Sequence, residues 1–528
     1  MKQSVLNTIQ KHLEGDFALE KPKDLSFGHY ATPVAFSLAK IHRKSPILIA
    51  EELAQKFAQE DIFTKVDALK GYLNFKLSDD FLDQKTTQAI LDENNFAKGK
   101  KDQKILLEYV SANPTGPLHI GHARGAVFGD TLYKVGKHLG YDITAEYYVN
   151  DAGNQIDLLG LSIYLAGRDK FTDHEVKWPD EFYRGEYIYD LACEAKEHFG
   201  SDIYEDENNI SVLSTWGKDK MLELIRQNLA DANITFDTFV SEKELFSKWE
   251  ETLRALKEHD AVYEKDGKTW LKSTQKGDEK DRVVVREDGR PTYLAGDIIY
   301  HNEKFKRGYD HYINIWGADH HGYIARVKAS IDFLGFDSDK LEVILSQMVA
   351  LLKGGEPYKM SKRAGNFILM SDVVEEVGAE ALRFIFLTKK SDTHLEFDVD
   401  MLKKEDSSNP IYYIQYAHAR INQIFEKSGK TPNQVVQVKL EDLDEDSQNL
   451  LFTALLLPEV LEDSFESRQL QKLTDYLKSL SALYHQFYNK HKIVGSKNED
   501  KLLKLSAMVA VSLRTGLKLM GIEAKYKM

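Results

Sequence analysis

The feature that most constrains the fold is a strand–loop–helix–strand unit that begins near residue 105. The apolar run ILLEYV (105–110) indicates a buried strand, and the turn-rich segment SANPTGPL follows it. A helical pattern runs from His119 to Leu139, Gly140 is placed to end that helix, and DITAEYYV (142–149) indicates the next strand. Strands joined through a helix pair in parallel, so we predict an α/β domain with a parallel sheet.

The same alternation resumes after a long insertion. DRVVVRE, HYINIWG (311–317) and LEVILSQMVALL are predicted strands, and YIARVKASIDFLG is a predicted helix between the last two. The insertion, at about residues 155–280, contains a stretch from Asp173 to Glu207 in which acidic residues far outnumber basic ones, which is typical of a solvated surface. We expect the α/β domain to span residues 101–395, insertion included.

The two ends of the chain follow other patterns. Residues 1–100 combine a predicted helix in SPILIAEELAQKFAQE, with Ser45 as N-cap and Pro46 in the first turn, and a half-buried strand in KGYLNFKL (70–77). These features predict a small α+β domain. Leucine-rich periodicity in residues 396–528 predicts an all-α domain.

Composition excludes several classes of protein. Of 528 residues, 42% are apolar and 29% charged, an ordinary globular composition, and neither a secretory signal nor an apolar run of membrane-spanning length is found. The single cysteine, Cys193, cannot close a disulfide or build a thiolate-rich zinc site, which fits a reducing cytoplasm. The net charge of -14 argues against a general nucleic-acid coat protein but leaves local basic patches open.

The first chemical motif lies where the predicted strand at 105–110 gives way to the helix. It reads NPTGPLHIGH, from Asn113 to His122. Free backbone N–H groups and the positive end of a helix dipole converge at such a junction, which makes a natural anion site. His119 and His122 are three residues apart and share one helix face, so both could donate hydrogen bonds to a phosphate. Gly121 lets the backbone approach a ligand closely.

The second motif, more than 230 residues downstream, is a basic loop flanked by glycines. It reads KMSKR, from Lys359 through Met360, Ser361 and Lys362 to Arg363. Three cations in five residues suit a clamp for polyphosphate, although a short basic run is more often a solvated loop. Paired with the histidine motif, it favours nucleotide chemistry.

Together the two motifs resemble the signatures of class I aminoacyl-tRNA synthetases, and the chain resembles the arginyl-tRNA synthetases over essentially its whole length. The likeness includes GDFALEKP, KGYLNFKL, EYVSANPTGPLHIGHARG, YYVNDAGNQI, YLAGDIIYH, WGADHHGY, NPIYYIQYAHARI and LRTGLKLMGIEAKYKM. The chain departs from the family at Arg363, where serine is usual, and in its last four residues. The resemblance implies a Rossmann-like class I catalytic domain between an N-terminal domain that contacts the tRNA D-loop and a C-terminal anticodon-binding domain.

The resemblance also implies an activity, arginine–tRNA ligation, with L-arginine, ATP, Mg²⁺ and tRNA(Arg) as reactants or partners, in a cytoplasmic and monomeric enzyme. Glu108, Tyr293 and Asp297 are implied to hold the arginine side chain, and Asn113 to orient its α-amino and carboxylate groups. Carboxylates suit this role because a guanidinium is a planar fork of donors. A solvated strand-end acid at Glu108 and a helix-start acid at Asp297 are the plainer interpretations.

Further roles follow from the same resemblance. The histidines and Lys359 and Lys362 are the implied catalytic groups. Gly121, Met360, Ser361, Asp319 and His320 are implied to contact ATP, although Asp319 could instead be a helix N-cap. The tRNA-contacting set comprises Tyr72 and Asn74, which alternate on a predicted strand, and Tyr412, Tyr416 and Arg420, which are spaced by four on a predicted helix. The sequence alone does not decide whether the tyrosines lie at the surface or in the core.

Other functions compete with this one. A cysteinyl-tRNA synthetase needs a thiol-selective metal site that Cys193 alone cannot supply, and a glutamyl enzyme needs a basic pocket where Glu108 and Asp297 stand. A catalytically inactive tRNA-binding paralogue is the third alternative, which the intact histidine and lysine motifs disfavour.

Overall fold

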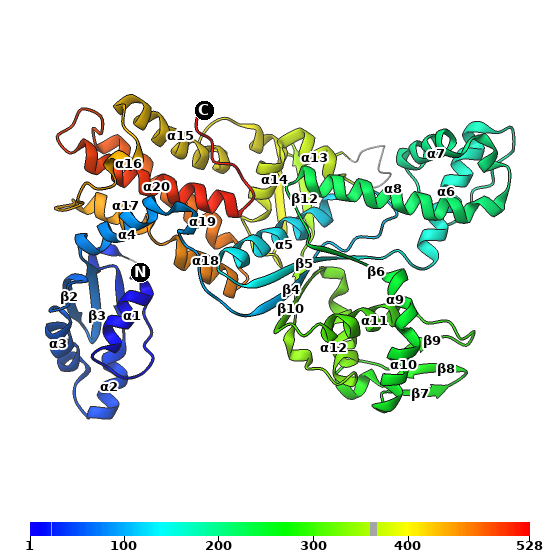
Figure 1. The fold of residues 1–528 in the computed structure, drawn as a ribbon, viewed down its shortest axis with the longest axis horizontal. Coiled ribbons are helices and arrows are strands. Elements are labelled where there is room, and N and C mark those ends of the chain that lie inside the picture. Colours follow the sequence, from blue (N-terminus) through cyan, green and yellow to red (C-terminus); the bar gives the residue numbers. More distant parts are fainter. Residues whose placement is uncertain (23, 360–366) are drawn as a thin grey trace. The chain divides into compact units, whose positions relative to one another are not determined.

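The structure is a computed structural model that describes residues 1–22, 24–359 and 367–528 (Figure 1). The chain divides into two compact units, one made of residues 1–99 with 405–528 and the other of residues 100–404. The N-terminal and C-terminal segments, expected as separate domains, therefore pack together as one unit. In the described residues, every helix is too short or too polar to cross a bilayer.

The second unit is built on a five-stranded parallel sheet, which confirms the predicted α/β class. Its order is β11–β10–β4–β5–β6, comprising Leu341–Ser346, His311–Gly317, Lys104–Glu108, Asp142–Val149 and Thr238–Ser241. Helix α5 (Ile120–His138) joins β4 to β5, as the sequence predicts. Strand β6 comes from the insertion and was not predicted, because four residues with no apolar alternation give no strand signal.

Two predicted strands differ from the expected arrangement. DRVVVRE contains β9 (Arg282–Val285), which lies in a separate antiparallel sheet with β7 (Val262–Lys265) and β8 (Lys268–Leu271). LEVILSQMVALL is split into β11 and β12 (Val349–Lys353), and β12 pairs with β13 (Glu356–Pro357) and β14 (Leu395–Asp398). Local sequence indicates an extended backbone but does not choose its partner strand, which packing decides.

The insertion carries a helical subdomain with its own apolar core. Helices α6 (Asn154–Phe171), α7 (Glu186–Phe199) and α8 (Ile210–Asp231) pack around buried Ile163, Tyr204 and Leu213. Short helices α9 (Glu242–Leu245) and α10 (Trp249–Glu258) follow, and the rest of the unit adds α11 (Tyr293–Lys306), α12 (Ile324–Phe333), α13 (Met370–Val377) and α14 (Ala379–Phe386).

A buried ion pair ties α14 to α5. The Arg383 guanidinium lies 2.5 Å from the Asp130 carboxylate, both side chains are fully buried, and Arg383 also donates to the carbonyl of Ala232 at 3.0 Å. Lys134 contacts the same carboxylate at 2.6 Å. The pair therefore holds α14, α5 and the end of α8 together around the Asp130 carboxylate.

Arg383→Met should lower the free energy of unfolding by about 3 kcal/mol, because it leaves the buried Asp130 carboxylate with the half-buried Lys134 as its remaining charged partner. Arg290→Met is the matched control, since Arg290 pairs with Asp288 on the surface and its loss should leave the free energy of unfolding nearly unchanged. Urea unfolding of the two variants and the parent measures both. Equal losses would contradict the assignment of Arg383 as a structural anchor.

The first unit begins with a small α+β fold, as predicted for residues 1–100. Its antiparallel sheet has the order β1–β3–β2, formed by Tyr30–Thr32, Tyr72–Leu77 and Phe63–Leu69. Its helices are α1 (Lys2–Gln10), α2 (Val34–His42), α3 (Pro46–Phe57) and α4 (Asp79–Leu91). Ser45 and Pro46 begin α3 as predicted, although the Ser45 side chain accepts no cap hydrogen bond.

The C-terminal part of this unit is all-α, as predicted. It comprises α15 (Pro410–Ser428), α16 (Pro432–Val435), α17 (Glu445–Ala454), α18 (Leu457–Glu466), α19 (Gln471–Lys490) and α20 (Glu499–Leu519). Helix α20 contacts α4 of the N-terminal segment: buried Lys504 lies 2.5 Å from Asp83 and donates to Thr87 at 2.8 Å. Arg514 pairs with Glu93 just after α4. These contacts make one unit of the two segments.

Candidate active site

The candidate site lies at the carboxyl ends of β4, the central strand of the parallel sheet, and of its neighbour β10. Chain order reverses here, since β5 and β6 continue on one side of β4 while β10 and β11 lie on the other. Helices leave such a reversal in opposite directions, which opens a crevice for ligands. The histidine motif follows β4, and Gly317, the end of β10, begins the WGADHHGY segment.

The two histidines of the first motif meet as their spacing predicts. His119 is the N-cap of α5 and accepts a hydrogen bond from the Gly121 N–H at 3.1 Å, and its ring stacks on His122 at 3.7 Å between centroids. Burial lowers the pKa of His119. It lowers the pKa of His122 to about 3, with His119 as the second cause. Both rings are therefore neutral at pH 7, and each can donate one N–H.

A cavity of about 590 Å³ surrounds these histidines. The first motif contributes Asn113, His119 and His122 to its lining, and the insertion contributes Phe182, Tyr183, Arg184 and Tyr187. Tyr187 donates a hydrogen bond to the Thr115 carbonyl at 3.1 Å, so the insertion is fastened to the motif loop. The buried His122 Nδ1 has no hydrogen-bond partner in the described residues. An open polar cavity beside a helix N-terminus suits a polyphosphate.

The lysine motif is described only at its start. Lys359 is exposed and follows β13, outside the lining of the histidine cavity. Met360, Ser361, Lys362 and Arg363 lie outside the described residues. Their predicted roles at the phosphates stay predictions.

A second, smaller cavity of about 120 Å³ brings together the predicted arginine-binding residues Glu108, Tyr293 and Asp297. Tyr293 and Asp297 share one face of α11, and Glu108 ends β4. The pKa of Asp297 is raised to about 8, chiefly by burial and then by the nearby acids Glu242 and Glu108, against the opposing effect of Arg326. Asn113 lines the histidine cavity instead.

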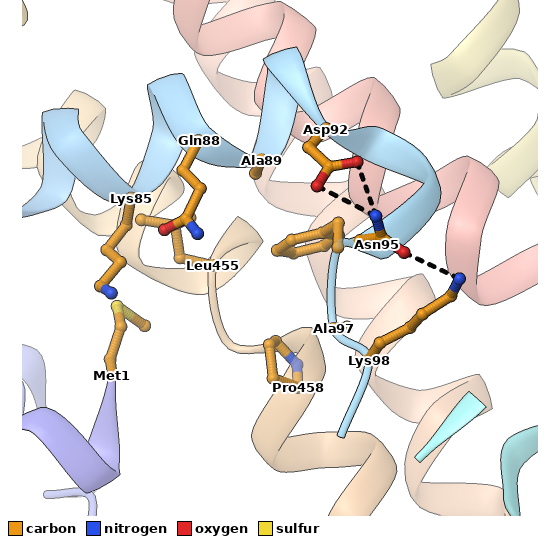
Figure 2. A pocket seen from close by; sticks show the side chains of 11 residues that line it. Met1, Lys85, Gln88, Ala89, Asp92, Asn95, Ala97, Lys98, Leu455 and Pro458 are labelled. Atoms are coloured by element: carbon orange, nitrogen blue, oxygen red, sulfur yellow. Dashed lines mark hydrogen bonds between the residues drawn. The ribbon is translucent and has the colours of Figure 1, made fainter. Parts of the chain in front are cut away.

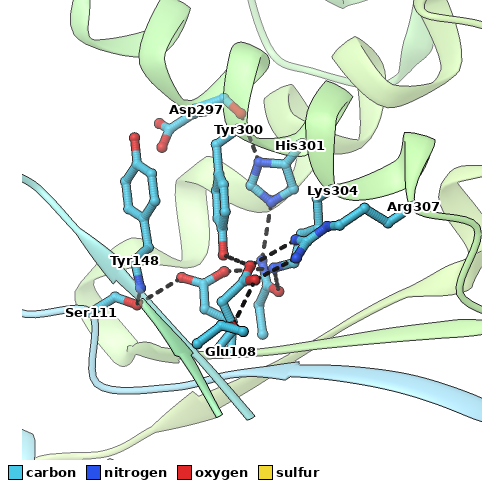
Figure 3. A network of polar contacts seen from close by, with 11 residues as sticks. Glu108, Ser111, Tyr148, Asp297, Tyr300, His301, Lys304 and Arg307 are labelled. Carbon is cyan, nitrogen blue, oxygen red and sulfur yellow. Dashed lines mark hydrogen bonds and ion pairs between the residues drawn. The ribbon is translucent and has the colours of Figure 1, made fainter. Parts of the chain in front are cut away.

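The carboxylate of Glu108 is already bound by a buried lysine. Lys304 donates to Glu108 at 2.7 Å and to the Asn314 side-chain oxygen at 2.6 Å, and Ser111 donates to Glu108 at 3.0 Å (Figure 3). Lys304 is fully buried and Glu108 nearly so. The negative charge of Glu108 is therefore largely offset, whereas Asp297 has no such cation against it in the described residues.

Two buried polar atoms in this region lack a partner in the described part of the chain, the Tyr148 hydroxyl oxygen and the Asn150 side-chain oxygen. Both residues line the small cavity, and Figure 3 shows Tyr148 reaching from β5 toward Asp297. Buried acceptors without donors are costly unless a ligand supplies the donors. A guanidinium carries five N–H donors and would satisfy them.

The two residues predicted to contact adenosine, His320 and Asp319, differ in their position relative to the small cavity. His320 lines the small cavity beside Gly317, whereas Asp319 is absent from that lining and its side chain is 83% exposed. Both belong to a short 3₁₀ turn, Ala318–Tyr323. The structure therefore brings His320 to the site and leaves Asp319 at its outer edge.

The predicted D-loop contacts also differ in exposure. Tyr72, at the start of β3, is 43% exposed and meets the Phe36 ring edge-on at 5.4 Å. Asn74, on the same strand face, is 8% exposed. A base could stack on Tyr72, while little of Asn74 is open to hydrogen bonding.

The predicted anticodon-side residues form one stripe on α15. The Tyr412 and Tyr416 rings stack at 6.1 Å, and Arg420 donates to the Tyr416 hydroxyl at 2.9 Å. The Arg420 guanidinium also lies 4.6 Å from the Tyr416 ring centroid and 4.7 Å from that of Tyr488. All three residues of the stripe are half-buried, which is compatible with either interpretation of the sequence.

A further cavity, of about 260 Å³, lies within the first unit between α4 and the C-terminal helices (Figure 2). Lys85 and Lys98 line it, and Asn95 bridges Asp92 at 3.0 Å and Lys98 at 2.9 Å. None of the predicted catalytic residues lines it.

Comparison with known families identifies the chain. Residues 85–426 match the family described as tRNA synthetases class I (R), catalytic domain. Residues 1–77 match the arginyl tRNA synthetase N terminal domain, and residues 414–528 match the DALR anticodon binding domain. The chain belongs to the arginyl-tRNA synthetases. The enzyme is thus a ligase that forms an aminoacyl-tRNA, and its three-part organisation agrees with the resemblance seen in the sequence.

Individual relatives agree. The arginine–tRNA ligase of a Nitratiruptor species is 66% identical over the full length of both chains, and that of Campylobacter jejuni is 61% identical over both. A Campylobacter jejuni structure titled as an arginyl tRNA synthetase is 61% identical, with a TM-score of 0.83 over 86% of this chain and all of the other. Thermus thermophilus arginyl-tRNA synthetase, at 20% identity and a TM-score of 0.75 over both chains, shares the fold.

Several residues of the site escaped the sequence analysis. Lys304 is two turns beyond Asp297 on α11, a spacing that could have shown it facing the same side. Tyr148 and Asn150 stand at the end of β5, where strand-end residues of a parallel sheet gather. Glu242 and Arg184 come from the insertion, and no sequence signal links them to the site.

Proposed function

We propose that the enzyme activates L-arginine with ATP, using the small cavity for arginine and the histidine cavity for ATP, and then transfers arginine to the terminal adenosine of tRNA(Arg). One observation carries this assignment of residues. The small cavity holds Asp297, an acid with no ion-pair partner among the described residues, together with polar atoms of Tyr148 and Asn150 that likewise have no hydrogen-bond partner there. Such a lining suits a cationic side chain rich in N–H donors.

In the first step the arginine carboxylate attacks the α-phosphorus of ATP and pyrophosphate leaves. Neutral His119 and His122 donate hydrogen bonds to the phosphates, and the N-terminus of α5 supplies further N–H groups. Lys359 and Lys362 stabilise the negative charge that develops on pyrophosphate as it leaves. His320 and, at the edge, Asp319 contact adenosine, while Asn113 orients the amino acid. The residues act by positioning and charge stabilisation rather than as nucleophiles.

In the second step a ribose hydroxyl of the terminal adenosine, the 2′-OH by class analogy, attacks the arginyl carbonyl and AMP leaves. Mg²⁺ enters as the complex with ATP, because phosphate oxygens are ligands that it prefers. The described residues contain no group of three or more His, Cys, Asp or Glu side chains placed to hold a metal.

The tRNA contacts extend over the first unit. Tyr72, with its exposed ring, stacks on an unpaired D-loop base, and the largely buried Asn74 supports this contact from the same strand face. Tyr412, Tyr416 and Arg420 face the anticodon side. The linker 98–104 and the C-terminal stretch from Gln486 supply basic groups for the phosphates.

We further propose that the enzyme works as a monomer in the cytoplasm. The histidine motif, the acidic pocket and the tRNA-binding segments all belong to one chain, and the single thiol, Cys193, fits a reducing compartment. Light scattering of the purified enzyme with and without tRNA measures the oligomeric state.

ATP–pyrophosphate exchange tests the proposed activity. We expect exchange with arginine, measured with and without tRNA, and the family resemblance predicts that tRNA is needed. Glutamate and cysteine are the matched alternatives because they represent the two competing class I specificities. Exchange with either of them but not with arginine would overturn the proposal.

The lysine motif gives a separate prediction. Lys362→Ala should lower kcat for adenylate formation by roughly 100-fold while changing arginine binding little, because its charge matters most as pyrophosphate departs. Steady-state exchange, with ATP and arginine varied separately, resolves the two parameters. A raised KM for ATP at unchanged kcat would show uniform nucleotide binding instead.

A further inference from the structure

Arg184, a cation of the insertion, lines the histidine cavity that the proposed function assigns to ATP. It belongs to the sequence FYRGEY, two residues before α7, and its side chain is exposed. In the surrounding stretch, residues 173–207, acidic side chains far outnumber basic ones. One of the few basic residues of an acidic segment therefore stands at the cavity that is to receive a polyanion.

The backbone on both sides of Arg184 is held in place. The Tyr183 N–H donates to the hydroxyl of Ser162, which is fully buried on α6, at 2.9 Å. Three residues beyond Arg184, the Tyr187 hydroxyl donates to the Thr115 carbonyl in the histidine motif at 3.1 Å. The segment that carries Arg184 is thus tied to the core of the insertion at one end and to the histidine motif at the other.

The guanidinium of Arg184 has no carboxylate partner among the described residues. Instead it lies 4.6 Å from the centroid of the Phe182 ring, which lines the same cavity. Such a contact orients a cation without neutralising its charge. The planar fork of N–H donors on arginine matches pairs of phosphate oxygens, so an arginine without an acid beside it is suited to bind a phosphate group.

The histidine cavity needs a cation for this purpose. Among the described residues that line it, Arg184 is the one charged side chain, because His119 and His122 are neutral at pH 7 and no acid or lysine contributes. Lys359 lies outside the lining. The N-terminus of α5 adds partial positive charge, which offsets a small part of a triphosphate. Arg184 therefore supplies the full positive charge of the described lining.

We propose that Arg184 binds the β- and γ-phosphates of ATP and the pyrophosphate that leaves in the first step. The inference rests on the proposed function and deepens it, since it gives the insertion a part in nucleotide binding. The α-phosphorus has to meet the carboxylate of the bound arginine, and Arg184 does not line the small cavity assigned to that substrate. This arrangement favours the two outer phosphates as the partners of Arg184.

Arg184→Gln tests this role because it removes the charge and leaves a polar side chain. The matched control is Lys177→Gln, which removes one positive charge from an exposed side chain of the same stretch that does not line the histidine cavity. Arg184→Lys keeps the charge and removes the planar fork. Calorimetry on the full-length enzyme, without arginine or tRNA, measures the Kd for MgATP, magnesium pyrophosphate and AMP. The melting temperature of each variant is recorded as well.

We expect Arg184→Gln to weaken the binding of MgATP and pyrophosphate by about 10-fold, the loss of one charged hydrogen bond, and that of AMP by less than about 2-fold. Arg184→Lys should lose less, because a point charge replaces the fork. Lys177→Gln should match the parent. The melting temperatures should agree, since Arg184 is exposed and breaks no ion pair with the described residues.

Unchanged affinity for MgATP and pyrophosphate in Arg184→Gln would overturn the inference. Equal weakening of AMP would also overturn it, because the outer phosphates would then not be the partners, and so would an equal loss in Lys177→Gln. Weaker tRNA binding at unchanged ATP affinity would place Arg184 at an RNA phosphate instead. If Arg184→Gln does not fold, Arg184→Lys decides by the same comparison of pyrophosphate with AMP. A parent enzyme that binds no ATP would refute the proposed function itself.

Discussion

Asp297→Asn should lower kcat/KM for arginine by about 10² to 10³-fold, because it removes the uncompensated carboxylate from a buried pocket that receives a cation. The KM for ATP should change little, since the histidine cavity does not include this residue. Exchange kinetics with each substrate varied measure both effects. Glu303→Gln, on the same helix but paired with Lys306 at the surface, is the control and should behave as the parent.

The pH dependence of stability and of arginine affinity is a second test of the role of Asp297. The Asp297 pKa of about 8 lies above its ordinary value near 4, so in the folded enzyme the carboxyl keeps a proton that the unfolded chain has lost. Its contribution to the free energy of unfolding therefore falls as the pH rises from about 4 to 8. Arginine binds the ionised form of Asp297. Arginine affinity should therefore rise as the pH approaches 8 and level off above pH 8. Asp297→Asn should flatten both trends, and an unchanged pH profile would contradict the assignment.

His122→Ala should slow adenylate formation by roughly 100-fold, because it removes a positioned donor to the reacting phosphates. His122 is neutral and half-buried, and its buried Nδ1 has no partner in the described residues, so the substitution breaks no charge pair of the enzyme. Single-turnover formation of adenylate, with arginine affinity measured in parallel, separates chemistry from binding.

His138→Ala, at the opposite end of α5, controls for general effects of losing a histidine from that helix. Its adenylate formation should lie within about 2-fold of the parent, because the site is at the N-terminal end, where the helix dipole acts. A loss in His122→Ala that appears only as weaker arginine binding would place His122 at the amino acid rather than at the phosphates.

Much of the candidate site could be predicted from residue spacing within single helices and loops. The loop between residues 110 and 119 follows a buried strand, and the i, i+3 spacing of His119 and His122 is enough to bring their rings together at a helix start. The i, i+4 spacing of Tyr293 and Asp297, and that of Tyr412 and Tyr416, likewise fixed which side chains share a face. Helix geometry alone determines these relations.

Sheet pairing was less predictable. The extended character of residues 282–285 was correct, but their sheet is the small antiparallel one beside α11. Strand β6, which completes the edge of the parallel sheet and leads into Glu242, has too short a run to be read from sequence. Pairing depends on segments far apart in the chain, and so on packing that no local pattern encodes.

Local patterns were enough to predict the α/β class, the helical C-terminal part, the two nucleotide motifs and the acids at the end of β4 and in α11. The electrostatic surroundings of those acids could not be predicted, because they depend on tertiary packing. Glu108 meets Lys304, which is 196 residues away, whereas Asp297 meets Glu242 and no comparable cation in the described residues. Burial and neighbouring charge set the behaviour of a carboxyl group, and both arise only when distant segments pack together.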